Sequence, residues 1–305
     1  MYVEFKFLVD PFGIQLTDNQ PFTINVGGEE SVALTIERYE KQVNAIQITT
    51  RAVFPIADET VQALIKLPPH LPLNKCNVNV QETVRTIESR IRNVSFQTIR
   101  LLRWIYDIGG VHSPFGVIHY KWSDDNVTWY QFPTQYAVTE LYRINQIKVA
   151  DISSEQIAQM VHDMIDEPVA HSLYLEAERN LGNNNRSCLV LAVAAAETAI
   201  KSVVIHFLPQ SEWLVKNIPS PPIVQLYKKY LPKILPIGEQ NFLSKDKLKI
   251  LEEAVKKRNE LVHGKGTDVH THDLLPMLKT VKCLIWLCDY YNGNKWALRF
   301  SKESS

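Results

Sequence analysis

The chain has 305 residues, of which 45% are hydrophobic and 22% are charged, and its formal net charge is zero. This composition excludes a disordered or fibrous chain, and the balanced charge excludes a whole-molecule field that would attract nucleic acid or a membrane surface. A polyanionic partner must therefore be bound by local patches of charge.

Residues 1–150 mix strand-like and helix-like stretches. Three stretches rich in β-branched and aromatic residues, near residues 2–9, 31–39 and 44–54, are bounded by Gly, Pro, Asn or Asp, which predicts strands. Residues 116–133 predict a β-hairpin with the sequence SDDN at its tip. We therefore predict an α+β domain over residues 1–150, which senses a trigger, positions RNA or restrains the second domain.

The predicted hairpin carries five aromatic residues, which allow two interpretations. Aromatic side chains can stack on nucleobases, but on strands they more often pack into the core of a sheet. We favour core packing for Tyr120, Trp122, Trp129, Tyr130 and Phe132.

One long amphipathic helix is predicted at about residues 80–107. Apolar residues, among them Val84, Ile87 and Ile91, repeat on one face at about 100° per residue. The opposite face carries Arg85, Arg92, Arg100 and Arg103. A row of arginines can follow a phosphate backbone, so these four are candidate RNA contacts. More often such a row is the solvated side of a helix.

From residue 151 onward the strand patterns stop and helical patterns follow. The stretch SSEQIAQMVHDMID begins with a serine and a glutamine near the spacing of a capping box. Helical spacing then continues through residues 169–181, 186–207, 244–263 and 273–291, with a Pro-rich connection near residue 220. We predict an all-α bundle over residues 151–305.

The apolar run at residues 188–209 is long enough to be weighed as a membrane span. Glu197 and Lys201 lie near its middle, where a charge in lipid is costly, and their spacing allows them to pair on one helix face. We therefore predict the central helix of a bundle, surrounded by neighbours, and no membrane partner.

The four cysteines match neither a disulfide framework nor a metal-binding spacing. Three of them, Cys188, Cys283 and Cys288, lie in apolar helical runs, where cysteine acts as a small buried hydrophobe. The first residues, MYVEFKFLVD, carry no basic leader. Both observations favour a reducing, cytoplasmic setting.

An arginine interrupts the apolar face of the predicted helix at residues 244–263. The apolar stripe consists of Leu248, Leu251, Ala254, Val255 and Val262. Arg258 projects into the middle of that stripe and Asn259 onto its edge. His263 follows just before Gly264, which is expected to end the helix in a left-handed conformation. A charge that faces a bundle is costly unless it meets a paired carboxylate, a polar cavity or a ligand.

The sequence RNELVH at Arg258–His263 resembles the Arg-(four to six residues)-His motif of HEPN domains, including the polar residue that commonly follows their arginine. The context is similar as well, because an Ala-rich helix with an embedded glutamate, AVAAAETAIK, precedes the motif helix and an apolar helix at 273–291 follows it. The resemblance covers roughly residues 153–292 and does not extend to the N-terminal half.

Resemblance to HEPN ribonucleases implies a metal-independent endoribonuclease without a cofactor, in which the 2′-hydroxyl of the RNA attacks the adjacent phosphate. Arg258 would grip phosphate oxygens and His263 would transfer protons. Asn259 would contact a phosphate oxygen or orient the histidine. Glu197 would act as an orienting carboxylate, and Lys257 would be a further RNA contact.

The resemblance also implies a homodimer in which both motifs line one cleft. Such proteins act as toxins or antiviral-defence effectors, which implies an inhibitory partner protein or an activating ligand. Arg258 and His263 lie about 500° apart on a straight helix, so they converge only if the last turn loosens or if two chains share the site.

Two alternatives stay open for the motif. The helical domain is a non-catalytic HEPN adaptor that binds a nucleotide or a partner protein, or Arg258 pairs with Glu197 or Glu260 and only staples the bundle while His263 caps the helix.

The remaining histidines give only weak indications of a functional site. The stretch TDVHTHD offers His270, His272 and Asp273 as metal ligands, but no second ligand cluster accompanies them, and we interpret it as a polar loop and helix cap. His162 and His171 flank a turn at a proline and are expected on the bundle surface.

Overall fold

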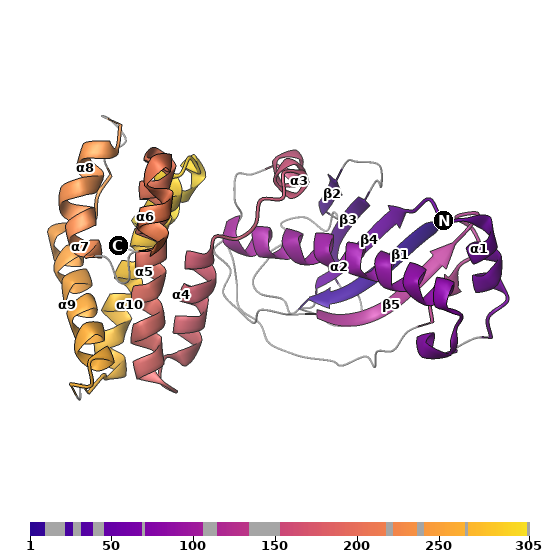
Figure 1. Ribbon diagram of the computed structural model, residues 1–305, viewed down its shortest axis with the longest axis horizontal. Helices are drawn as coiled ribbons and strands as arrows, with labels where there is room; N and C mark the ends of the chain where they lie inside the picture. The colour runs from indigo at the N-terminus through magenta and orange to yellow at the C-terminus, as the bar shows by residue number, and fades with distance from the viewer. Residues whose placement is uncertain are drawn as a thin grey trace. The chain divides into compact units, whose positions relative to one another are not determined.

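The computed structural model divides into two compact units, Met1–Glu167 and Pro168–Ser305 (Figure 1). All described strands belong to the first unit, and the described part of the second unit contains only helices. The predicted order, a sheet domain followed by a helical domain, is confirmed. The structure describes residues 1–9, 22–26, 32–38, 46–68, 71–105, 115–133, 153–217, 222–236, 241–265 and 268–303.

The boundary between the units follows Glu167, later than the boundary predicted at residue 150. Helix α3 (Ser154–His162), expected in the helical domain, belongs to the first unit. From helix α2 (Val78–Ile105), Gln97 donates a hydrogen bond to the Ile165 carbonyl at 2.9 Å. Arg100 donates two hydrogen bonds to Asp166, each of 2.6 Å. These contacts tie the residues after α3 to α2, which the periodicity of the sequence does not reveal.

The sheet of the first unit is antiparallel, with the strand order β2-β3-β4-β1-β5-β6. The strands are β1 (Tyr2–Val9), β2 (Phe22–Val26), β3 (Val32–Arg38), β4 (Ile46–Val53), β5 (Phe115–Ser123) and β6 (Tyr130–Gln131). Two short helices, α1 (Asp58–Ile65) and η1 (Leu73–Lys75), lie between β4 and α2 in the sequence. All strands except β2 lie where they were predicted. β2 was missed because it is only five residues long, with a single fully buried residue, Ile24, among the described side chains.

Helix α2 lies across one face of the sheet (Figure 1). Val3, Phe5 and Phe7 alternate along β1 and are buried, as expected for side chains on one face of a strand. Thr50 of β4, which pairs with Phe5, places its hydroxyl 2.9 Å from that of Ser95 on α2. The helix predicted at about residues 80–107 is therefore confirmed, together with the apolar face that covers the sheet.

The aromatic residues of the hairpin pack into this sheet. Tyr120, Trp122 and Phe132 are buried. Tyr130 stacks on Trp122 with ring centroids 4.8 Å apart. The preferred prediction, core packing, is confirmed for Tyr120, Trp122 and Phe132, whereas Tyr130 is half-buried.

Asp125 fixes the tip of the hairpin. Its Oδ1 atom accepts hydrogen bonds from the backbone N–H groups of Thr128 and Val127, each of 2.7 Å. The bonds from Thr128, Val127 and the Ser123 hydroxyl lower the pKa of the Asp125 carboxyl. Because the pKa falls on folding, the stabilisation is present above the pKa of an unfolded aspartate and is lost as the pH falls through the folded value.

We therefore expect Asp125→Ala to lower the urea midpoint of the first unit at pH 7. The difference between variant and wild type should shrink as the pH is lowered below about 4. Urea titrations at pH 7, 5 and 3, followed by tryptophan fluorescence, measure this. A difference that stays constant with pH would contradict the proposed role of the carboxylate.

The second unit is a helical bundle in which α5 contacts α4, α9 and α10 (Figure 1). The long helices are α4 (Val169–Asn180), α5 (Asn185–Phe207), α9 (Lys245–Val262) and α10 (Thr271–Tyr291). Shorter pieces are η2 (Pro209–Ser211), α6 (Glu212–Asn217), α7 (Ile223–Gln225), η3 (Leu226–Tyr230), α8 (Leu231–Ile234), η4 (Lys295–Ala297) and α11 (Leu298–Glu303).

Helix α5 occupies the position expected of a central helix. It is the one described helix that is long and apolar enough to cross a membrane, and 56% of its most apolar window is buried inside the structure. Four alanines on α5 are buried, and small side chains allow neighbouring helices to approach closely. They are Ala192, Ala195, Ala196 and Ala199.

The four cysteines are free thiols and all are buried, as predicted for the three in helices. Burial raises the pKa of Cys188 to about 11, so this thiol is unreactive at neutral pH.

His171 lies in the bundle core, and its predicted place on the surface is wrong. Its Nε2 atom is 2.6 Å from the Asp289 carboxylate, and its ring meets the edge of Trp286 with centroids 4.4 Å apart. The buried carboxylate of Asp289 supplies the polar partner that makes an internal histidine tolerable. His162, by contrast, is exposed on α3.

Candidate functional site

The motif lies at the end of α9, and the sequence explains both ends of this helix. The Ser244 side chain accepts a hydrogen bond from the Lys247 N–H and caps the start. Gly264 has φ +73°, and the N–H groups of Gly264 and Lys265 bond back to the Leu261 and Glu260 carbonyls. This pair of bonds defines a Schellman motif. The predicted left-handed end at Gly264 is confirmed.

The apolar face of α9 is shorter than predicted. Leu251 and Ala254 are buried, but Val262 is 59% exposed. Val255 is half-buried and lines a surface groove. The stripe therefore stops packing before the last turn, where the bundle no longer covers α9.

Arg258 follows the buried part of the stripe and points to α5. Its guanidinium forms an ion pair with the Glu197 carboxylate, and the two side chains are 11% and 16% exposed. Burial lowers the pKa of Arg258, but a guanidinium stays protonated in proteins. The pair joins α9 to the central helix α5, which is the structural role considered for Arg258 from the sequence.

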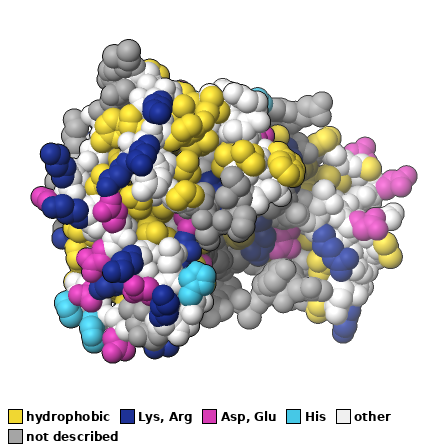
Figure 2. Space-filling model, turned by 60° about the vertical axis from the view of Figure 1, so that its left-hand side comes forward, with side chains coloured by type: hydrophobic (Ala, Val, Ile, Leu, Met, Phe, Trp, Pro, Cys, Tyr) yellow, Lys and Arg dark blue, Asp and Glu magenta, His cyan; other side chains and the backbone are white. Residues whose placement is uncertain are grey.

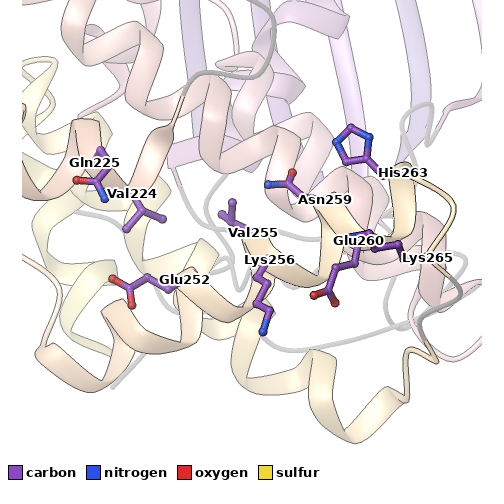
Figure 3. Close-up of a pocket in the computed structure, with 9 residues that line it drawn as sticks. All are labelled: Val224, Gln225, Glu252, Val255, Lys256, Asn259, Glu260, His263 and Lys265. Carbon is purple, nitrogen blue, oxygen red and sulfur yellow. The ribbon is translucent and has the colours of Figure 1, made fainter.

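Asn259 and His263 line a groove of about 610 Å³ on the outer side of α9 (Figure 3). One turn separates them, so both side chains point to the same side of the helix in the close-up. Val224 and Gln225 of α7 form part of the lining. The other lining residues are Glu252, Val255, Lys256, Glu260 and Lys265.

Charges of both signs surround the groove. Lys256 and Lys265 supply two cations, and Glu252 and Glu260 supply two carboxylates. Lys228 of η3 forms an ion pair with Glu252, which offsets one of the negative charges. Charges of both signs also cover the helical unit around its histidines in the surface view (Figure 2). The groove can therefore offer cations to a phosphate, but it is not a strongly basic channel.

The structure separates the predicted catalytic residues into two sets. Asn259 and His263 face the groove, whereas Arg258 and Glu197 hold each other between α9 and α5. Within one chain the groove lacks the arginine, as the angular separation of Arg258 and His263 suggested.

Lys257, predicted as an RNA contact, lies outside the groove. Its ammonium group is 3.2 Å from both Asp273 of α10 and Glu253 of α9. This network fastens α9 to the start of α10.

The arginines of α2 do not form one solvent-facing row. Arg103 is only 5% exposed, so its predicted place on the solvated face is wrong. Arg92 bonds to Glu88 and to the Tyr120 hydroxyl, and Arg100 bonds to Asp166. Arg85 is exposed and donates to the Gln81 side chain at 3.2 Å. Their contacts within the first unit make the groove on α9 the better candidate site.

The histidine-rich stretch spans the start of α10 (Thr271–Tyr291) and is polar as expected, but the side chain of the N-cap residue His270 makes no capping hydrogen bond. Asp273 is 3.0 Å from His272 and also binds Lys257, and His270 occupies the N-cap position of α10. Among the described residues no group of three or more His, Cys, Asp or Glu side chains could hold a metal ion.

A second cavity, of about 350 Å³, lies in the first unit. Leucine, isoleucine and proline side chains make up most of its lining, and Tyr130 is its one titratable residue. It offers no group for proton transfer near neutral pH, so it does not compete with the groove as a catalytic site.

The far side of the groove was not predicted. Val224 and Gln225 follow a Pro-rich stretch and carry no motif, and only the fold brings them to α9. The RNELVH motif, with Asn259 directly after Arg258 and His263 at the helix end, was the signal in the sequence that marked the near side. Comparison with protein-family models, curated proteins and solved structures gives no match to this chain.

Proposed function

We propose that the helical unit is a metal-independent endoribonuclease of HEPN type, in which the groove on α9 holds the RNA. The observation that carries the proposal is the groove itself, with Asn259 and His263 on one face and Lys256 and Lys265 beside them. An amide, an imidazole and two ammonium groups suit a phosphodiester, because they provide hydrogen bonds, proton transfer and positive charge.

In the proposed reaction the 2′-oxygen of the RNA forms a bond to the neighbouring phosphorus as the bond to the 5′-oxygen breaks. The 2′-hydroxyl loses its proton to a base and the 5′-oxygen gains one. His263 is suited to one of these transfers because one imidazole nitrogen can accept a proton and an imidazole N–H can donate one. Arg258 would stabilise the negative charge on the phosphate oxygens.

Arg258 does not line the groove of its own chain, so the proposal includes a homodimer in which two copies of α9 contribute to one site. The exposed Val262 lies on the last turn beside the motif and would be covered in such a pair. We further propose a cytoplasmic toxin or antiviral-defence effector that an inhibitory protein or a ligand controls, with the first unit as the regulatory part.

The products test this function directly. Purified full-length protein is expected to cut single-stranded RNA and to leave 2′,3′-cyclic phosphate and 5′-hydroxyl ends, at the same rate in excess EDTA. Sequencing of the ends, with and without prior phosphatase treatment, measures this. Cleavage that requires a divalent metal, or 5′-phosphate ends, would contradict the mechanism.

The Arg258–Glu197 pair favours a second candidate, a non-catalytic adaptor that binds a nucleotide or partner protein. In that case the motif arginine is a structural residue and the groove is a binding surface only. An adaptor would bind RNA or nucleotide without producing new RNA ends.

A further inference from the structure

Glu197 occupies an unfavourable place for a lone carboxylate. It lies on α5 among buried apolar residues such as Ala196 and Ile200, and its own side chain is only 16% exposed. A carboxylate there is costly unless a cation neutralises it, and Arg258 supplies that cation. In the single chain the Arg258–Glu197 ion pair is therefore favoured.

The ion pair with Glu197 weakens Arg258 as a phosphate ligand. A guanidinium binds phosphate through paired N–H donors and its positive charge. Glu197 already uses a donor of Arg258 and offsets its charge. RNA must therefore compete with an internal carboxylate before Arg258 contributes fully.

The last turn of α9 gives Arg258 a path toward the groove. On a helical wheel Val262 lies about 40° from Arg258 and Asn259 about 100° in the same direction. In the single chain Val262 is exposed, so the surface between Arg258 and Asn259 is open at this end of the helix before a second copy covers it. A long arginine side chain can lay its aliphatic stem along such an apolar surface while its guanidinium reaches water.

Glu197 does not lose every cation when Arg258 moves. Lys201 lies one turn further along α5, at the spacing that lets opposite charges pair on a helix. This spacing would let Lys201 offset the charge of the Glu197 carboxylate when Arg258 leaves it.

We propose, on the basis of the ribonuclease function above, that Glu197 is an inhibitory lock. It holds Arg258 away from the RNA site until a substrate phosphate or a second copy of the chain draws the arginine toward the groove. Glu197 would then oppose RNA binding, contrary to the orienting role predicted from the sequence.

The test uses binding, so that it does not depend on cleavage. The full-length chain is titrated with a single-stranded 2′-deoxy oligonucleotide, which has no 2′-hydroxyl to attack, and the salt dependence of the Kd is measured. Glu197→Gln keeps the shape and removes the charge. We expect it to bind about tenfold more tightly than wild type, with a salt slope steeper by about one because one more cation meets phosphate.

Three further variants show whether tighter binding comes from the release of Arg258 or from a general loss of negative charge. Glu212→Gln removes the same charge from the exposed Glu212–Lys216 pair on α6 and should change neither Kd nor slope. Arg258→Ala added to Glu197→Gln should abolish the gain. If Glu197→Gln does not fold, the shorter carboxylate in Glu197→Asp should give a smaller gain of the same sign.

Unchanged or weaker binding by the Glu197 variants would overturn the proposal that Glu197 is an inhibitory lock. Equal tightening by Glu212→Gln would overturn it as well, because the effect would then be general electrostatics. Failure of the ribonuclease proposal is a separate result, since it appears as the absence of new RNA ends with wild-type protein, whatever the oligonucleotide titrations show.

Discussion

Replacing His263 with alanine is expected to slow RNA cleavage by about 10²- to 10⁴-fold, the usual contribution of a positioned acid or base. His263 is exposed at the C-cap of α9 and faces the groove, and its backbone N–H already bonds to the Asn259 carbonyl. Removal of the ring therefore takes away a proton-transfer group without opening a cavity in the bundle.

The measurement is the initial rate of cleavage of a labelled single-stranded RNA, together with the thermal midpoint of each protein. His162→Ala, which removes an exposed histidine from α3, is the matched control and should keep the wild-type rate. In cells, growth arrest should accompany the wild type and the control but not His263→Ala. A wild-type rate for His263→Ala would refute a catalytic role for this residue.

Arg258→Ala is expected to destabilise the helical unit by about 2 kcal/mol. Removal of one partner of a buried ion pair typically costs about 3–5 kcal/mol, because the other charge stays buried without compensation. The lower value is expected here because both side chains keep some exposure. Loss of cleavage by this variant thus mixes chemistry with stability, whereas His263→Ala does not.

A double replacement distinguishes charge from packing. Arg258→Met with Glu197→Leu substitutes apolar side chains for the pair and should recover wild-type stability to within about 1 kcal/mol. Urea unfolding of the full chain, followed by far-UV circular dichroism, gives the coupling energy of the two sites. Single replacements that leave the unfolding transition unchanged would show that the pair does not stabilise the bundle.

Regular periodicity made the main elements predictable. The apolar face of α2 was predicted correctly because many residues repeat at helical spacing. The central place of α5 was predicted because its sequence is apolar nearly all round, and the packing of the hairpin aromatics because such side chains on strands more often pack into a core. Features that depend on contacts between residues far apart in the sequence were not predictable in this way. β2 is short and pairs with β3 without a strong pattern of its own. Arg103 sits at a position that looks solvated on a wheel but is covered in the fold.

The candidate site was likewise predictable only where the signal lay within one helix. The sequence marked Arg258 as anomalous because it interrupts an apolar stripe, and the structure shows a buried partner for it. The sequence alone did not show whether Arg258 pairs with Glu197 or with Glu260, because separation along the chain does not reveal which carboxylate lies nearer in the fold. Helix α7 could not be foreseen as a wall of the groove for the same reason.

The Schellman turn at Gly264 gives the two ends of the motif different mechanical support. Arg258 is anchored by a carboxylate on the central helix, whereas His263 lies in the final turn with an exposed side chain, and there the N–H groups of Gly264 and Lys265 bond back to the Leu261 and Glu260 carbonyls. A displacement of the chain after Gly264 would therefore be transmitted to the turn that carries His263 through these two hydrogen bonds, whereas the Arg258 guanidinium is held by a separate contact with α5. A ligand that binds next to that turn would therefore act first on His263, the residue proposed to transfer protons.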